Sequence, residues 1–205
     1  MTRIKICGIT CLRDAMEAVA AGADALGFVF APSPRRIDPR AAGTIVAALP
    51  PFVCTVGVTV DASAHEIEAI LELARVDLLQ FHGNESAPEC RLQSRPVLKR
   101  IPVRPGDNAP ALLARTAEYA GLRLLIDPGS GDGRSFPHAL AQALPAPFVL
   151  AGGLGPDNVG EAIRLARPSG IDVSSGVETT PGRKDPRLLR ALVHAVRLED
   201  ARHAA

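Results

Sequence analysis

The chain has 205 residues, of which 47% are hydrophobic and 22% are charged, and its 23 basic residues almost balance its 22 acidic ones. These fractions are typical of globular proteins and exclude an intrinsically disordered chain. A net charge of +1, with one Tyr, six Phe and no Trp, argues against nucleic-acid partners, which need basic surfaces or aromatic stacking platforms. We therefore expect a compact protein that acts on a small molecule.

The cysteines indicate a reducing compartment. Cys7, Cys11, Cys54 and Cys90 form no Cys-x-x-Cys pair and have no histidine at zinc-site spacing. The charged opening MTRIKICGIT lacks the apolar stretch of a signal peptide, and no run approaches the ~20 apolar residues of a membrane span. We expect a cytoplasmic protein with free thiols and no membrane partner, with Cys54 and Cys90 in the core.

Short aliphatic runs alternate with segments of helical spacing along the whole chain. The predicted strands are residues 4–7, 25–30, 55–60, 78–82, 97–101, 122–127, 148–151 and 170–174. The predicted helices are residues 12–21, 39–49, 64–74, 110–120, 157–166 and 186–196. Apolar runs without regular alternation are typical of strands buried on both faces, and their alternation with helices indicates βαβ units.

The strand count favours one fold class over another. Eight runs that start about every 25 residues predict a minimal (β/α)8 TIM barrel of the α/β class, shorter than is typical of that fold. The alternative is a doubly wound open sheet, which usually has a glycine-rich dinucleotide turn after its first strand. The first strand here ends in CGIT, without G-x-G-x-x-G. We predict a single catalytic domain over residues 1–205, with residues 199–205 a frayed tail.

In a barrel of this type, catalytic residues lie at the carboxyl ends of the strands and in the loops that follow. Several predicted strands end in reactive or polar residues, among them Cys7, His82 and Asp127. Arg35 and Arg36 follow the second strand. Two adjacent guanidinium groups can bind a carboxylate or a phosphate, although the usual alternative is solvation or a surface ion pair. His82 is either a ligand-facing imidazole or a structural histidine.

The seventh and eighth predicted strands end in glycine-rich turns, at residues 151–158 and 172–177. Barrels frequently bind phosphate with these two loops and the N-terminus of a short extra helix. Glycine lets backbone N–H groups approach an anion closely, and a helix N-terminus adds a favourable dipole. The alternative is a pair of ordinary tight turns with Asp157 as a helix N-cap. We favour a phosphate site.

Cys7 and Asp127 form the candidate acid–base pair, because strands one and six can face each other across a bound substrate. Nearby Lys5, Arg35 or a helix N-terminus can lower the pKa of a thiol and make it a base. A partly apolar pocket can raise the pKa of a carboxyl group and make it an acid. The alternative places Cys7 in the core and Asp127 as the cap of the following turn. The histidines and acids form no metal-ligand cluster, so we expect no metal.

Five blocks of the chain resemble the phosphoribosylanthranilate isomerase family, in the same order. They are residues 5–10 (KICGIT), residues 22–30 with Ser33-Pro34-Arg35, residues 80–83, residues 151–154 with Asn158-Val159, and residues 172–178 with Pro181-Gly182. The matching blocks run from residue 3 to about residue 186, nearly the whole chain. The combination of KICGIT and DVSSGVE in one short barrel is specific to this family.

The resemblance implies a tryptophan-biosynthesis enzyme with no cofactor. It would convert N-(5-phospho-β-D-ribosyl)anthranilate to 1-(2-carboxyphenylamino)-1-deoxy-D-ribulose 5-phosphate by an Amadori rearrangement. Cys7 would be the general base, Asp127 the general acid, and Arg35 the partner of the anthranilate carboxylate. The remaining implied substrate-binding residues are Gln80, His82, Gly152, Gly153, Asp172, Ser174, Ser175 and Gly176. The small-molecule substrate would be the partner, and the chain would act as a monomer or a homodimer.

Three departures from the family pattern concern substrate affinity. Phe81 stands where the family more often has Leu, and Thr59 where it has Phe, so Thr59 would alter packing around the anthranilate ring if it faced the ligand. In the loop of residues 129–136, Arg134 keeps a positive charge but Asp132 adds an acid beside an expected anion site. Two alternatives remain, another phosphosugar barrel (a metal-dependent epimerase or an indole-forming lyase) and a non-catalytic phosphosugar-binding module.

Overall fold

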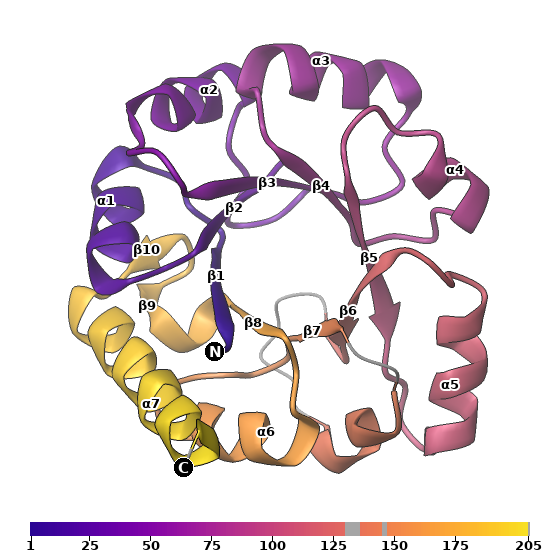
Figure 1. The fold of residues 1–205 in the computed structure, drawn as a ribbon. Coiled ribbons are helices and arrows are strands. Elements are labelled where there is room, and N and C mark those ends of the chain that lie inside the picture. The colour runs from indigo at the N-terminus through magenta and orange to yellow at the C-terminus, as the bar shows by residue number, and fades with distance from the viewer. Residues whose placement is uncertain (130–135, 145–146, 205) are drawn as a thin grey trace.

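The computed structural model describes residues 1–129, 136–144 and 147–204 of the chain. Eight parallel strands close into a barrel in sequence order, and β8 pairs with β1 to complete it (Figure 1). The strands are β1 (Arg3–Cys7), β2 (Ala25–Val29), β3 (Cys54–Thr59), β4 (Leu78–Phe81), β5 (Val97–Pro102), β6 (Arg123–Asp127), β7 (Phe148–Leu150) and β8 (Gly170–Val173). The predicted TIM barrel and its eight strands are confirmed.

Helices surround the barrel (Figure 1). They are α1 (Leu12–Ala21), α2 (Pro39–Ala48), α3 (Ala64–Ala74), α4 (Ala87–Arg91), α5 (Ala109–Ala117), α6 (Val159–Ala166) and α7 (Pro186–Ala204), with 3-10 turns η1 (His138–Ala143) and η2 (Ser175–Val177). A small antiparallel hairpin, β9 (Glu178–Thr180) and β10 (Arg183–Lys184), follows β8. The six predicted helices are present, whereas α4, η1 and the hairpin were not predicted because such short elements show no hydrophobic period.

Local capping explains where several helices begin. Ser63 and Glu66 form a reciprocal capping box at the start of α3, and Ser86 and Glu89 form another at the start of α4. Asp38 accepts hydrogen bonds from the first backbone N–H groups of α2. The capping box of Ser86 and Glu89 satisfies backbone N–H groups at the start of α4 that this five-residue helix cannot satisfy internally.

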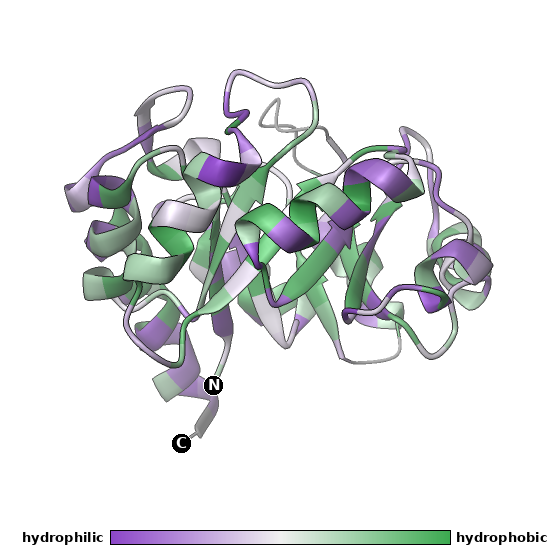
Figure 2. Cartoon of the chain, turned by 90° about the horizontal axis from the view of Figure 1, so that it is seen from above, coloured by the Kyte–Doolittle hydropathy of each residue, from purple (hydrophilic) through white to green (hydrophobic). Residues whose placement is uncertain are grey.

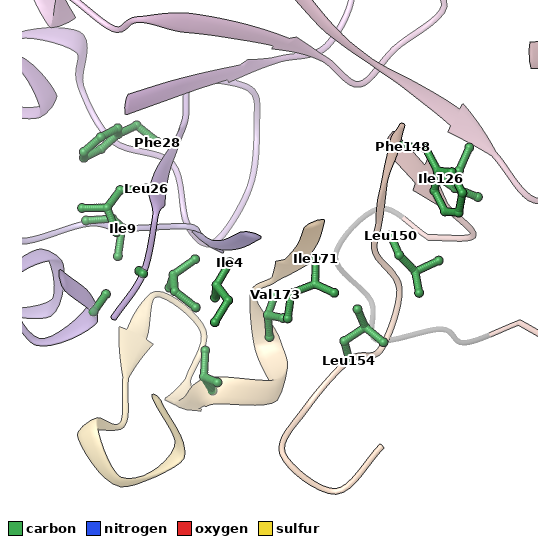
Figure 3. Packing of buried hydrophobic residues seen from close by; sticks show 14 of the residues in the cluster. Ile4, Ile9, Leu26, Phe28, Ile126, Phe148, Leu150, Leu154, Ile171 and Val173 are labelled. Atoms are coloured by element: carbon green, nitrogen blue, oxygen red, sulfur yellow. The ribbon is translucent and has the colours of Figure 1, made fainter. Parts of the chain in front are cut away.

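The main hydrophobic core lies between the strands and the helices. Alternate strand residues such as Ile4, Leu26 and Ile171 are fully buried there, and Figure 3 shows part of this layer. A second, small cluster of Leu98, Leu125 and Ala151 fills the barrel interior. In Figure 2 the strands are predominantly hydrophobic, whereas the surrounding helices also carry hydrophilic segments. Because side chains alternate between the two faces of each strand, every second strand residue points into the barrel interior or its mouth.

The end of the chain differs from the expected frayed tail, because α7 continues to Ala204. Glu199 is buried, and the carboxylate of Asp200 accepts hydrogen bonds from the backbone N–H of Thr2 at 2.9 Å and from its hydroxyl at 2.7 Å. Arg197 donates to the carbonyl oxygen of Thr2 at 2.7 Å. Polar residues that the sequence alone assigns to solvent therefore attach this helix to the N-terminus.

The structure also tests the expected placement of the cysteines and the expected lack of a membrane span. All four cysteines are free; Cys90 is buried as expected, whereas Cys54 is only half-buried. Within the part of the chain that the structure describes, none of the helices has both the length and the hydropathy required to cross a membrane.

Candidate active site

A cavity of about 210 Å³ opens at the carboxyl ends of the barrel strands. The predicted site residues that line it are Cys7, Arg35, Gln80, His82, Asp127, Gly152, Gly153, Asp172, Ser174 and Ser175. These residues come from the ends of six strands and the loops that follow them. Barrel closure thus brings together side chains from positions 7 to 175 of the chain.

Gly176 is the predicted substrate-binding residue that does not line this cavity. A Cβ atom at this position would overlap the backbone carbonyl oxygen of Leu154. The glycine therefore allows the loop after β8 to approach the loop after β7, in which Gly152 and Gly153 adopt left-handed backbone conformations with φ of 101° and 61°. Its contribution is to the shape of the two glycine-rich loops.

Cys7 ends β1 with its thiol beside the ammonium group of Lys5. Gly27 on the adjacent strand leaves room for both, since a Cβ there would lie 2.8 Å from Cys7 Sγ and 2.9 Å from Lys5 Nζ. Lys5 Nζ donates to Asp172 Oδ1 at 2.8 Å, and both of these side chains are buried. Asp172 therefore holds the Lys5 cation next to the thiol.

Burial and the neighbouring Lys5 cation have opposite effects on the pKa of the Cys7 thiol. Burial raises the pKa of the Cys7 thiol above its ordinary value, and the Lys5 cation opposes this rise without cancelling it. Burial alone would lower the pKa of Lys5, but Asp172 and Cys7 favour its charged form and the net pKa is raised. Lys5 thus acts on the thiol in the expected direction, but burial dominates.

Asp127 ends β6 with both carboxylate oxygens in contact. Oδ1 accepts the backbone N–H of Gly129 at 3.0 Å, and Oδ2 lies 3.2 Å from His82 Nε2. Gln80 Nε2 lies 3.3 Å from His82 Nδ1, so with Gln80 donating there His82 Nε2 carries the hydrogen, with Asp127 Oδ2 and the carbonyl oxygen of Gly129, at 3.4 Å, both within reach. Asp127 therefore caps the following turn and lines the cavity at once. Asp132 and Arg134, in the next loop, lie outside the described residues.

The two adjacent arginines have different environments. Arg35 is buried, lines the cavity and pairs with Glu178, with Nε 2.9 Å from Oε1 and Nη2 2.7 Å from Oε2. Arg36 is exposed, as expected for a solvated arginine. Ser174 also lines the cavity, but its hydroxyl donates to the carbonyl oxygen of Cys7 at 3.1 Å.

The departures from the family pattern in β3 and β4 do not reach the cavity. Thr59 is buried, yet it is Val58 and Val60, on either side of it, that line the mouth. Phe81 is likewise buried and absent from the lining. Since neighbouring strand residues point to opposite faces, Thr59 and Phe81 pack away from the barrel interior, and Thr59 does not face the ligand.

One buried charged residue that bonds to the strand end bearing Cys7 was not recognised from the sequence. Lys184 follows a glycine turn in a polar segment, a pattern typical of an exposed lysine, but its side chain is completely buried. It donates to Glu178 and to the backbone at the ends of β1 and β8. The one signal in the sequence is its position two residues after Pro181-Gly182, within the range that resembles the family.

Comparisons with known proteins agree with this geometry. The model of the N-(5'phosphoribosyl)anthranilate (PRA) isomerase family matches residues 4–195. A Pseudomonas putida protein named N-(5'-phosphoribosyl)anthranilate isomerase is 50% identical over 203 residues, which cover 95% of this chain and 97% of that protein. A Pseudomonas aeruginosa protein of the same name is 50% identical over 204 residues, with 95% of each chain covered.

Solved structures show the same similarity. The crystal structure of phosphoribosyl anthranilate isomerase from Thermus thermophilus matches with a TM-score of 0.87 and 41% identity, over 96% of this chain and 99% of that one. A phosphoribosyl anthranilate isomerase in complex with reduced 1-(o-carboxyphenylamino)-1-deoxyribulose 5-phosphate matches with a TM-score of 0.86 and 37% identity, with the same coverage. The chain belongs to the N-(5'-phosphoribosyl)anthranilate isomerase family.

Proposed function

We propose that the cavity isomerises N-(5-phospho-β-D-ribosyl)anthranilate, with Asp127 as general acid and Cys7 as general base. The observation that carries this assignment is that the two side chains, from β6 and β1, line one cavity together with Arg35 and the two glycine-rich loops. Proton transfer by two positioned groups is the chemistry that an Amadori rearrangement requires.

The reaction begins with two proton transfers by the protein and ends with a tautomerisation, and no protein group changes its oxidation state. Asp127 protonates the ribose ring oxygen, and the ring C–O bond breaks as the anthranilate nitrogen donates its electron pair to form an iminium. The Cys7 thiolate then removes the proton from the adjacent sugar carbon, and its electrons neutralise the iminium to give an enolamine. In the tautomerisation the enol oxygen loses a proton and the former anomeric carbon gains one, which yields the ketone. Exchange with solvent then returns a proton to Asp127 and removes one from Cys7. His82, 3.2 Å from Asp127, is placed to stabilise the carboxylate after the first step.

Two anionic ends of the substrate determine its orientation in this proposal. Gly152, Gly153 and Ser175 would bind the phosphate through the loops after β7 and β8, where backbone N–H groups can approach an anion closely. Arg35 would bind the anthranilate carboxylate. Anchoring both ends would hold the reacting carbon between acid and base, which lowers the entropic part of the barrier.

The partner in this proposal is a single small molecule. A base that must be a free thiol is suited to a reducing compartment, and we therefore place the protein in the cytoplasm. Cys7 and Asp127 of one chain line the same cavity, so either a monomer or a homodimer would supply both groups of the proposed acid–base pair.

Turnover of freshly prepared phosphoribosylanthranilate, followed by loss of its anthranilate fluorescence, tests the activity. The isosteric Asp127→Asn and the truncating Cys7→Ala should each lower kcat by about 10²–10⁴ while product-analogue binding persists. Arg36→Met, at the exposed neighbour of Arg35, is the matched control and should keep the wild-type rate.

Three outcomes would contradict the proposal in different ways. Tight analogue binding by the wild-type protein without turnover would favour the non-catalytic module. Loss of activity with a chelator would favour a metal-dependent barrel. Near-normal rates in both Cys7→Ala and Asp127→Asn would show that the acid and base are wrongly assigned even though the activity is present.

A further inference from the structure

Lys184 is a buried cation that the proposed mechanism does not use. Its ammonium group donates to Glu178 Oε1 at 2.7 Å, to the carbonyl oxygen of Cys7 at 2.5 Å and to that of Ser174 at 3.3 Å. Its backbone N–H donates to Asp14 Oδ2 of α1 at 2.7 Å. Three acceptors satisfy the three donors of an ammonium group, so this buried charge has the partners it requires.

Glu178 connects Lys184 to Arg35. The two cations and the backbone N–H of Gly182 all donate to its carboxylate, which is almost completely buried. Burial alone would raise the pKa of Glu178, but the hydrogen bonds and charges of Arg35 and Lys184 lower it, and the net direction is down. Glu178 is therefore ionised at neutral pH and holds a negative charge between two positive ones.

This arrangement fixes one edge of the Arg35 guanidinium. Glu178 takes the Nε–Nη2 edge, whereas Nη1 makes no hydrogen bond to any residue that the structure describes. The aliphatic stem is also confined, because a Cβ at Gly8 would lie only 2.5 Å from Arg35 Cδ. A guanidinium group can bind carboxylates along two edges, so Arg35, which lines the cavity, retains one edge for the substrate.

The charges of the three side chains leave a net positive charge of one. Arg35 and Lys184 contribute two positive charges, and Glu178 neutralises one of them. A carboxylate on the substrate ring would be attracted to this positive charge through Arg35, whereas a neutral ring substituent would not.

We propose that Glu178 and Lys184 are positioning residues that hold Arg35 in the orientation that selects a substrate ring bearing a carboxylate. This inference rests on the proposed function. Lys184 also joins the carbonyl oxygens at the ends of β1 and β8, so the same side chain ties the orientation of Arg35 to the strand end that bears Cys7.

The test compares two ligand pairs that differ by one carboxylate. The first pair consists of the substrates phosphoribosylanthranilate and phosphoribosyl-aniline, for which KM and kcat are measured. The second pair consists of the non-reacting reduced product analogue and its form without the carboxylate, whose binding is measured by calorimetry. Glu178→Gln and Lys184→Met should weaken binding of the carboxylate-bearing ligands by about tenfold or more and raise KM more than they lower kcat. Ligands without the carboxylate should bind these variants as they bind the wild-type protein.

Double variants separate positioning from a general structural effect. In an Arg35→Met background, Glu178→Gln should cause no further loss, because the group that it orients is gone. Arg36→Met is again the matched control and should leave both ligand pairs unaffected. If Lys184→Met does not fold, as shown by circular dichroism, the isosteric Glu178→Gln and its combination with Arg35→Met decide the question.

Equal weakening of both ligands of a pair, or additive losses in the double variant, would overturn the inference and leave a purely structural role. Failure of the proposed function is seen separately. In that case the wild-type protein would not turn over phosphoribosylanthranilate, whereas the calorimetric comparison of the two product analogues would still report how Arg35 is oriented.

Discussion

Lys5 places a buried positive charge beside the Cys7 thiol, and Asp172 keeps it there with a 2.8 Å ion pair. The thiol has a raised pKa because burial outweighs the effect of the cation. The thiolate, which is the basic form, is therefore a minor species near neutral pH in the free protein. The thiolate fraction, and with it the rate at which Cys7 reacts with an alkylating reagent, should therefore rise as the pH increases above neutrality toward the pKa of Cys7.

Removal of the Lys5 charge should shift the ionisation of Cys7 to still higher pH. In Lys5→Met the pKa of Cys7 should rise, which lowers the thiolate fraction and kcat/KM at pH 7 by about tenfold for each unit of pKa. The rate of alkylation of the Cys7 peptide, measured by mass spectrometry across pH, reports the thiolate without turnover. Lys5→Met alone leaves the Asp172 carboxylate without its partner, so the double variant Lys5→Met/Asp172→Asn is measured as well. Arg3→Met removes an exposed positive charge from the same strand and is the control. An unchanged alkylation profile would contradict this role for Lys5.

The glycine-rich loops depend on backbone contact at Gly176. In Gly176→Ala the new methyl group would collide with the carbonyl of Leu154, so the loop after β7 must move. Overpacking of this kind costs about 1–3 kcal/mol, and we expect weaker phosphate binding with KM raised about tenfold. Gly155→Ala is the matched control, because its methyl group lies on the other side of the same contact and would meet the carbonyl oxygen of Gly176 at an ordinary 3.5 Å. Similar KM values for both variants would show that the loop contact is unimportant.

At the scale of whole elements, helix α7 joins the two ends of the chain. The carboxylate of Asp200 accepts hydrogen bonds from the backbone N–H and the hydroxyl of Thr2, and Arg197 donates to both residues. Burial alone would raise the pKa of Asp200, but the bonds from Thr2 and Arg197 lower it, and the net pKa is below its ordinary value. A carboxylate with a lowered pKa stabilises the folded state above its unfolded pKa, and this contribution is lost as the pH falls through the folded pKa.

Asp200→Asn should therefore destabilise the protein by about 1–2 kcal/mol at pH 7, because it weakens the charge-assisted bonds to Thr2. The difference from wild type should shrink in acid, below the ordinary pKa of an aspartate. Urea unfolding at pH 7 and pH 3.5 measures both effects. Glu68→Gln, at an exposed position of α3, makes the same chemical change without these bonds and should be neutral. Equal stability of the two variants at pH 7 would contradict the attachment of α7 through Asp200.

At the scale of the whole molecule, the barrel alone assembles the mouth. The residues of the cavity lining span Cys7 to Ser175, and Cys7 and Asp127 of the same chain both line the cavity. Neither group of the proposed acid–base pair therefore has to come from a second copy of the chain.

Specific activity should accordingly be independent of association. We expect constant turnover per chain over about a thousandfold dilution, even where size-exclusion chromatography detects a shift between dimer and monomer. Preincubation at the lowest concentration before assay controls for slow dissociation. A progressive loss of activity that parallels dissociation, and is reversed by added protein, would show that the site needs a partner subunit.

The sequence by itself determined the barrel and most of its mouth. Hydrophobic periodicity marked all eight strands, and because parallel strands end on the same side of a barrel, Cys7, His82 and Asp127 could be assigned to one site before their contacts were known. The resemblance to the family added the specific roles of Arg35 and of the glycine-rich loops, which the strand-end pattern had already marked. Those predictions depend on local pattern, which an amino-acid sequence displays directly.

Only the tertiary structure decided which charges meet. Lys184 bonds to the carbonyl of Cys7 across 177 positions of sequence, and Thr2 bonds to Asp200 across 198, because β8 pairs with β1 when the barrel closes. Strand periodicity places the side chain of Thr59 on the outer face, but only the observed packing showed that it is buried away from the ligand. Burial and long-range pairing depend on the closed fold. Lys184, Asp200 and Thr2 look ordinary in the sequence and acquire their contacts only in that fold.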